Sequence, residues 1–124
     1  MPYPVAMVAI VGVAVFFAGM GVYGLVAPGA LVRPFGVVVD GANARGEVRA
    51  VYGGFGVAVA GLLTVAAFDD GIRRGAVIAV AVALAGMAAG RLAGCLVERP
   101  RGFYPNWLYF GVEVVLGAVL WVAA

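Results

Sequence analysis

The sequence predicts an all-α integral membrane protein, a bundle of four helices that each span the bilayer. Of its 124 residues, 65% are hydrophobic and only 11% are charged, whereas about half of a globular domain is apolar and about a quarter is charged. The apolar residues gather in four stretches of about 20 residues, the length that crosses the hydrocarbon core of a membrane. We therefore expect a single four-span domain over residues 1–124.

The first predicted span covers residues 5–27 and ends at Pro28-Gly29, a helix stop signal. The segment before it lacks the basic region of a signal peptide, so we expect this helix to be retained. The second span is predicted at 43–68, the third at 76–97 and the fourth at 106–124. Helices are favoured over barrel strands, because the apolar runs do not alternate with polar residues.

The distribution of arginine predicts the orientation of the helices. Four spans place both termini on one side of the membrane. The connections on the opposite side carry or adjoin four arginines, Arg33, Arg45, Arg99 and Arg101. The connection on the same side as the termini carries two, Arg73 and Arg74. Because short loops rich in arginine stay in the cytoplasm, we expect a multi-pass protein with extracytoplasmic termini.

Composition argues against several kinds of chemistry. The chain has no His and a single Cys, Cys95, so it lacks the commonest general base and metal ligand and cannot form an internal disulfide. Redox, hydrolytic and metal chemistry are disfavoured, and neither a metal site nor a cofactor is predicted. The formal net charge of +2 is too small and too scattered to predict binding to nucleic acid.

Arg91 is the most unusual residue, because it lies in an otherwise uncharged apolar stretch. A charge in the hydrocarbon costs roughly 2.5–3.5 kcal/mol on insertion scales and needs a partner. Arg91 lies about six residues before the end of the third span and Glu113 about seven residues into the fourth, roughly 9–10 Å deep at the rise of an α-helix. We expect Arg91 to pair with Glu113 and to reach Glu47, with Arg49 entering the second span from the same side.

Three more polar residues extend this predicted cluster. Tyr52 shares a helical face with Arg49, and Asn106 and Tyr109 share one with Glu113. Together they are predicted to line a polar cavity that opens to the cytoplasmic interface. The alternative is a purely structural cluster that locks the helices together, since buried ion pairs can fix register without adding much stability.

Binding of a small molecule is the first function that such a cavity predicts. The ligand would be lipophilic or amphiphilic, such as a lipid, a quinone or an isoprenoid, and the protein would act alone or as an accessory subunit. Apolar helices would hold the tail of the ligand, and its polar group would contact Arg49, Tyr52, Arg91, Asn106 and Tyr109.

Two further functions stay open. In a membrane isomerase or cyclase, Glu47 and Glu113 would be the catalytic acid and base, because two carboxylates in unequal surroundings can hold different protonation states. A transporter or channel ranks last, since a neutral cluster of Arg and Glu is a poor path for ions.

Small residues predict how the helices associate. Gly86, Gly90 and Gly94 recur at a spacing of four, and such stripes let membrane helices approach closely. This stripe serves either packing within the chain or a homo-oligomer, and membrane lipids are the other expected partners.

An internal duplication is a further hypothesis. The segment from Ala18 to Gly36 matches the segment from Ala85 to Gly102 after a slip of one residue. At the offset of 66 residues that relates the ends of these segments, Glu47 falls on Glu113. The chain would then consist of two related helical hairpins, as in parallel membrane repeats.

The segment NARGEVRAVYGG, from Asn43, resembles the N-x-x-x-E-x-R-A-x-Y-G-G pattern of the domain of unknown function 4345 family. These small four-helix bacterial membrane proteins are themselves similar to the DoxX-like proteins. The segment from Gly24, the pair Gly90-Arg91 and the segment Glu113 to Gly117 also resemble the family. The chain departs from it after Arg91, where Glu98 to Gly102 replaces the usual Asp-Gly.

The resemblance implies a four-helix bundle in the bacterial cytoplasmic membrane. It also implies five marked polar positions, Glu47, Arg49, Tyr52, Arg91 and Glu113. It implies no activity, although some DoxX-like relatives are subunits of quinone-linked oxidoreductases, which agrees with an accessory role.

Overall fold

The computed structural model describes residues 1–124. All of its regular secondary structure is helical, and no strand is present. The all-α class is therefore confirmed. The elements in chain order are α1 (Tyr3–Val26), α2 (Pro28–Val32), the 3-10 helix η1 (Arg33–Phe35), α3 (Gly41–Val48), the π-helical segment η2 (Arg49–Gly54), α4 (Phe55–Phe68), α5 (Asp70–Gly94) and α6 (Asn106–Ala123).

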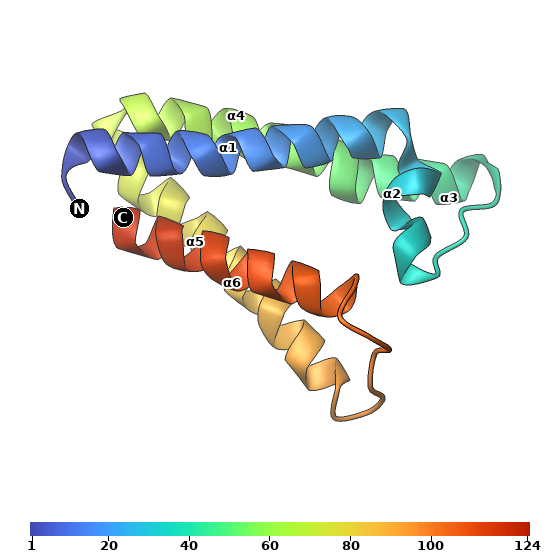
Figure 1. The fold of residues 1–124 in the computed structure, drawn as a ribbon. Helices are drawn as coiled ribbons and strands as arrows, with labels where there is room; N and C mark the ends of the chain where they lie inside the picture. The colour runs from blue at the N-terminus through green and yellow to red at the C-terminus, as the bar shows by residue number, and fades with distance from the viewer.

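Four of these helical stretches are long and apolar enough to cross a membrane, namely α1, the continuous stretch Gly41–Phe68, α5 and α6. The chain is a multi-pass membrane protein. Both termini lie at the same end of the molecule (Figure 1), as an even number of spans requires. We call this the terminal end, and we call the opposite end, where α3 and the α5–α6 connection lie, the open end.

The third span differs in its bounds from the expectation of 76–97, because it begins at Asp70 and ends at Gly94. Its start is set by Asp69, whose side chain accepts a hydrogen bond of 2.8 Å from the Gly71 backbone N–H and so caps the helix. Beyond Gly94 the backbone tightens, and the N–H groups of Cys95, Leu96 and Val97 donate to the carbonyls three residues before them. As a consequence Arg91 lies in the last turn of α5, nearer the helix end than the predicted depth of roughly 9 Å.

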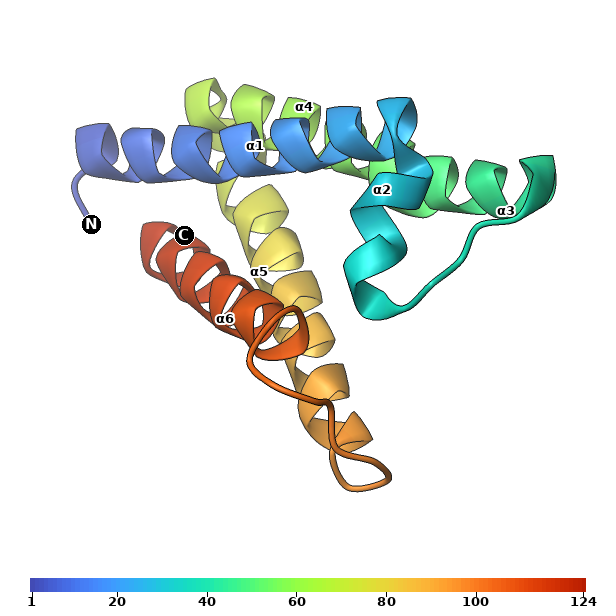
Figure 2. The same ribbon diagram turned by 45° about the vertical axis from the view of Figure 1, so that its right-hand side comes forward.

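The helices pair as two hairpins that diverge from one another. α1 lies along η2 and α4, and α5 lies along α6. The two pairs converge at the terminal end and separate toward the open end, in both views (Figures 1 and 2). The hairpin pairing agrees with the hypothesis of an internal duplication, which remains a prediction.

The hydrophobic core lies at the terminal end, where the hairpins meet. Its largest fully buried side chains are Ile10, Leu63, Val77 and Leu120, one from each span. All four come from the halves of their helices that are nearest the termini, because only there do four helices surround a common axis. The open end has to be held by polar contacts and short connecting segments instead.

Arg73 closes the terminal end of the core. Its Nε donates to the Ala66 carbonyl at 3.0 Å and its Nη2 to the Ala67 carbonyl at 3.2 Å, and the Tyr3 hydroxyl donates to the same Ala67 oxygen at 2.9 Å. The last carbonyls of a helix have no partner within that helix. These side chains therefore satisfy the end of α4, and Asp70 neutralises Arg73 at 2.6 Å.

Glycines bring α1 against η2 and α4. A Cβ added to Gly21 would lie 2.6 Å from the Val57 backbone N, one on Gly24 would lie 2.9 Å from the Gly53 N, and one on Gly56 would lie 2.9 Å from the Gly21 Cα. Close approach of backbones is the main way in which membrane helices pack. These glycines carry the packing within the chain.

The stripe of Gly86, Gly90 and Gly94 has no such role within the chain. A Cβ added at any of the three would meet nothing within 4 Å. The stripe therefore presents an open face of α5, and its use in a homo-oligomer stays a prediction.

Candidate functional site

A two-pronged ion pair joins α5 to α6 near the open end. The Arg91 Nε donates to Glu113 Oε1 at 2.8 Å, and the Arg91 Nη2 donates to Glu113 Oε2 at 3.0 Å. The Glu113 side chain is 5% exposed and that of Arg91 22%. A planar guanidinium that holds both carboxylate oxygens is the geometry in which each ion keeps its hydrogen bonds away from water. The predicted pairing of Arg91 with Glu113 is confirmed.

Asn106, at the start of α6, extends the pair. The Arg91 Nη1 donates to its Oδ1 at 3.3 Å, and this bond fixes which way the amide points. The Asn106 Nδ2 is then left buried with no hydrogen-bond partner. Buried N–H groups are rarely left unpaired, so this nitrogen is a donor that lacks an acceptor.

Two aromatic rings lie side by side next to the guanidinium. The Arg91 Cζ lies 5.6 Å from the centroid of the Phe35 ring and 5.9 Å from that of Tyr109, and the two rings are 5.3 Å apart. Such distances allow cation–π attraction. Phe35 comes from η1, so this contact also ties the first hairpin to α6 at the open end.

Phe35 is a site residue that the sequence analysis missed. It follows Arg33-Pro34 in the first connection, and no periodic pattern assigned it to a helix face. The available signal was that its connection lies on the same side of the membrane as the predicted polar cluster. The other residues predicted from the fourth span, Asn106 and Tyr109, do lie beside Arg91.

Glu47, Arg49 and Tyr52 lie elsewhere. Glu47 is exposed and forms no ion pair or side-chain hydrogen bond, and the Arg49 Nε donates to the Leu25 carbonyl at 3.1 Å on α1. Tyr52 is 42% exposed. The expected contact of Arg91 with Glu47 is therefore absent, because the hairpins diverge at this end. The helix that carries Glu47, α3, packs on α2 and η2 instead of α5.

The isomerase or cyclase hypothesis stays a prediction, and the same divergence places its two carboxylates on different hairpins. Glu113 is buried against α5, whereas Glu47 is exposed on α3. An acid and a base must both reach one substrate, and here they belong to different hairpins. No group of three His, Cys, Asp or Glu side chains is close enough to hold a metal ion.

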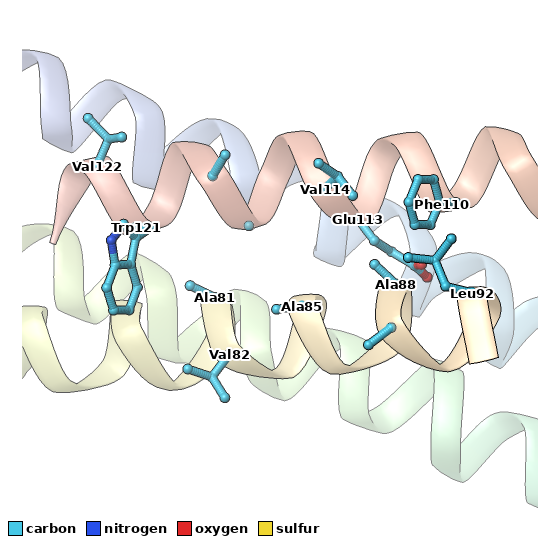
Figure 3. A pocket seen from close by; sticks show the side chains of 13 residues that line it. Ala81, Val82, Ala85, Ala88, Leu92, Phe110, Glu113, Val114, Trp121 and Val122 are labelled. Atoms are coloured by element: carbon cyan, nitrogen blue, oxygen red, sulfur yellow. The ribbon is translucent and has the colours of Figure 1, made fainter.

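An apolar groove of about 520 Å³ runs along the outside of the α5–α6 hairpin, and we call it the hairpin groove. Small residues of both helices form its floor, among them Ala85, Ala89, Gly117 and Ala118. Trp121 lies at one end, and Leu92 and Phe110 lie at the other beside the Glu113 carboxylate (Figure 3). The buried carboxylate is the one charged group in its lining.

A second hollow, of about 420 Å³, lies at the open end and has no hydrophobic residue in its lining. We call it the polar hollow. Its seven lining residues are Gly90, Arg91, Gly94, Glu98, Arg99, Pro100 and Asn106. The Arg91–Glu113 pair thus stands between two spaces of opposite character, with Glu113 on the apolar side and Arg91 on the polar side.

A comparison with protein families shows which family the chain belongs to. The family model "Domain of unknown function (DUF4345)" matches residues 5–124. The chain belongs to this family. No curated protein and no solved structure gives a significant match, and the likeness to DoxX-like proteins stays a prediction.

The five polar positions that the resemblance to the DUF4345 family implies lie on two different hairpins of this chain. Glu47, Arg49 and Tyr52 lie on the first hairpin, where Arg49 binds a carbonyl of α1. Arg91 and Glu113 form the buried pair of the second. The DUF4345 match carries no activity, so function has to be argued from the second hairpin and the two spaces beside it.

Proposed function

We propose that this protein binds a lipophilic small molecule that carries one small polar group. The chain of the ligand lies in the hairpin groove, and its polar group lies at the end of the groove beside Glu113. A lipid, a quinone or an isoprenoid has this form. The observation that carries the proposal is the meeting of an apolar groove with a buried charge pair.

The selectivity of the groove for its ligand over bulk lipid has to come from the shape of the groove and from the hydrogen bonds of the ligand's polar group. Lipid tails are as apolar as the groove, so burial of a chain there brings no hydrophobic gain over the bilayer. Each Glu113 oxygen accepts one hydrogen bond from Arg91 and retains a second lone pair. A hydroxyl or N–H on the ligand can donate to it in a site that excludes water, where such a bond is stronger than at the surface.

Filling the groove should remove the ligand. Ala85 lines the groove and is exposed, and Ala83 is exposed on the same helix but lies outside the groove. We expect Ala85→Phe to lower the amount of co-purified lipophilic compound by about tenfold, the effect of roughly 1.4 kcal/mol of lost binding energy. The measurement is mass spectrometry of organic extracts from equal amounts of pure protein.

Ala83→Phe is the matched control and should give the same extract as the wild-type protein. If wild type, Ala85→Phe and Ala83→Phe yield the same compounds in the same amounts, the groove holds only bulk lipid. The ion pair would then serve to lock α5 to α6, as the structural alternative holds.

We also propose that the protein lies in the bacterial cytoplasmic membrane with its termini outside. Every arginine except Arg73 and Arg74 lies at the open end, and arginine-rich ends face the cytoplasm. Cys95, the single cysteine, follows α5 at this end and is free. A maleimide that cannot cross membranes should therefore leave Cys95 unlabelled in intact spheroplasts and label it after permeabilisation.

The control moves the thiol to the other end, in the variant Cys95→Ala with Ala124→Cys. This variant should be labelled in intact spheroplasts. Labelling of Cys95 in intact spheroplasts, with protection of the terminal cysteine, would reverse the orientation.

A further inference from the structure

The polar hollow lies on a different side of α5 from the hairpin groove. The groove is lined from α5 by residues such as Ala85 and Leu92, and the hollow by Gly90 and Gly94. At 100° per residue these two sets point in nearly opposite directions from the helix axis. The hollow exists because neither glycine has a side chain, and a Cβ at either position would meet nothing within 4 Å.

Arg91 contributes free hydrogen-bond donors to the lining of the hollow. The Arg91 guanidinium carries five N–H groups, and the bonds to Glu113 and Asn106 use three of them. The Asn106 Nδ2 also has no partner, but this atom is buried and is closed off from the hollow. The Arg91 side chain is partly exposed and lines the hollow, so its two free N–H groups favour an occupant with acceptor oxygens.

The charges of the hollow favour an occupant that carries both signs. Arg91 is already neutralised by Glu113. Glu98 and Arg99 also line the hollow, and neither forms an ion pair within the chain. One free carboxylate and one free guanidinium match a group with one cation and one anion, whereas an anion alone would face Glu98 without compensation.

The position of the hollow indicates a lipid. Glu98 and Arg99 lie in the connection that follows α5 at the open end, where the span leaves the membrane. The stripe of Gly86, Gly90 and Gly94 runs from the hollow toward the membrane interior and has no side chain packed on it. An acyl chain can lie along this smooth face while its head group stays in the hollow.

We propose that the polar hollow binds the head group of a zwitterionic phospholipid with a primary ammonium, of the phosphoethanolamine type. Phosphate oxygens accept from Arg99 and from the remaining N–H groups of Arg91, and the ammonium donates to Glu98. A primary ammonium supplies the N–H donors for a charge-assisted hydrogen bond that a trimethylammonium lacks. This site is separate from the hairpin groove and does not depend on its ligand.

The test is a lipid titration of the delipidated full-length protein in mild detergent, followed by native mass spectrometry. The probes are phosphatidylethanolamine, phosphatidylglycerol and phosphatidylcholine with identical acyl chains. We expect phosphatidylethanolamine to bind about tenfold more tightly than phosphatidylglycerol, the scale of one charge-assisted hydrogen bond. Equal binding of the three lipids would overturn the proposal.

Variants that remove one charge each test the contacts of the ammonium and of the phosphate separately. Glu98→Gln should remove the preference for phosphatidylethanolamine while binding of phosphatidylglycerol persists, and Arg99→Gln should weaken both lipids by about tenfold. Arg74→Gln, an exposed arginine at the terminal end, is the control and should change neither. A preference that survives Glu98→Gln contradicts the assignment of the ammonium.

Space-filling variants locate the lipid. Gly90→Leu fills the hollow, and Gly61→Leu adds the same side chain to another open glycine on α4, where nothing lies within 4 Å of a Cβ. Gly90→Leu should abolish selective binding of phosphatidylethanolamine, and Gly61→Leu should retain it. The groove variant Ala85→Phe should also retain it. Loss with Ala85→Phe but not with Gly90→Leu would place the lipid in the groove and overturn this site alone.

Discussion

Replacing Arg91 by methionine should lower the free energy of unfolding in detergent by about 3–5 kcal/mol, the usual cost of breaking a buried ion pair by removing one partner. Glu113 would then remain as a carboxylate that is only 5% exposed and has lost both of its hydrogen bonds. Methionine keeps much of the volume of the arginine stem, so the effect reports the charge more than the packing. The measurement is chemical or thermal unfolding followed by far-ultraviolet circular dichroism.

The double variant Arg91→Met with Glu113→Leu tests the reason for that loss. Replacing both ions by apolar residues is often neutral or stabilising, so the double variant should recover most of the stability lost by the single one. Arg49→Met is a second control, because Arg49 is exposed and bonds only to the Leu25 carbonyl. If Arg49→Met cost as much as Arg91→Met, Arg49 would belong to the buried cluster after all.

Replacing Gly21 by leucine should separate α1 from α4 and destabilise the protein by about 3 kcal/mol or more, the upper range for overpacking. The new Cβ would lie 2.6 Å from the Val57 backbone N and 2.8 Å from the Gly53 carbonyl oxygen. Backbone atoms cannot rotate away as a flexible side chain does, so the helices themselves must move. The same unfolding measurement reports the loss.

Gly19→Leu on the same helix is the matched control. A Cβ at Gly19 meets nothing within 4 Å, and leucine has the higher helix propensity, by up to about 1 kcal/mol. This variant should be as stable as the wild-type protein or slightly more stable. Equal destabilisation by the two substitutions would mean that α1 and α4 do not pack through Gly21.

Local patterns were sufficient to predict the spans and one contact between them. A backbone in lipid must satisfy its hydrogen bonds within its own segment, so each long apolar stretch had to be a helix, and the structure has four. The pairing of Arg91 with Glu113 followed from the cost of an isolated charge in the membrane.

The arrangement of the hairpins was beyond the reach of such patterns. Glu47 and Glu113 occupy matching positions in the duplication hypothesis, yet Glu47 is exposed and Glu113 is buried. Spacing gives the depth of a residue along its helix but not the direction in which the neighbouring helix lies. For the same reason the most regular glycine stripe, at Gly86, Gly90 and Gly94, could not be assigned to packing within the chain or to an open face from the sequence, and the structure shows it open.

The sequence by itself determined that the protein lies in lipid, that it has four helices and that Arg91 requires an acidic partner. Hydropathy, helix length and the cost of burying a charge depend only on a segment and its medium. Only the tertiary structure decided which faces meet. Lipid and side chains are nearly equal in polarity, so no hydropathy pattern distinguishes a face that packs on a helix from one that faces lipid. The close contact at Gly21, the divergence of the hairpins, the groove and the polar hollow all depend on the fit of shapes between distant segments.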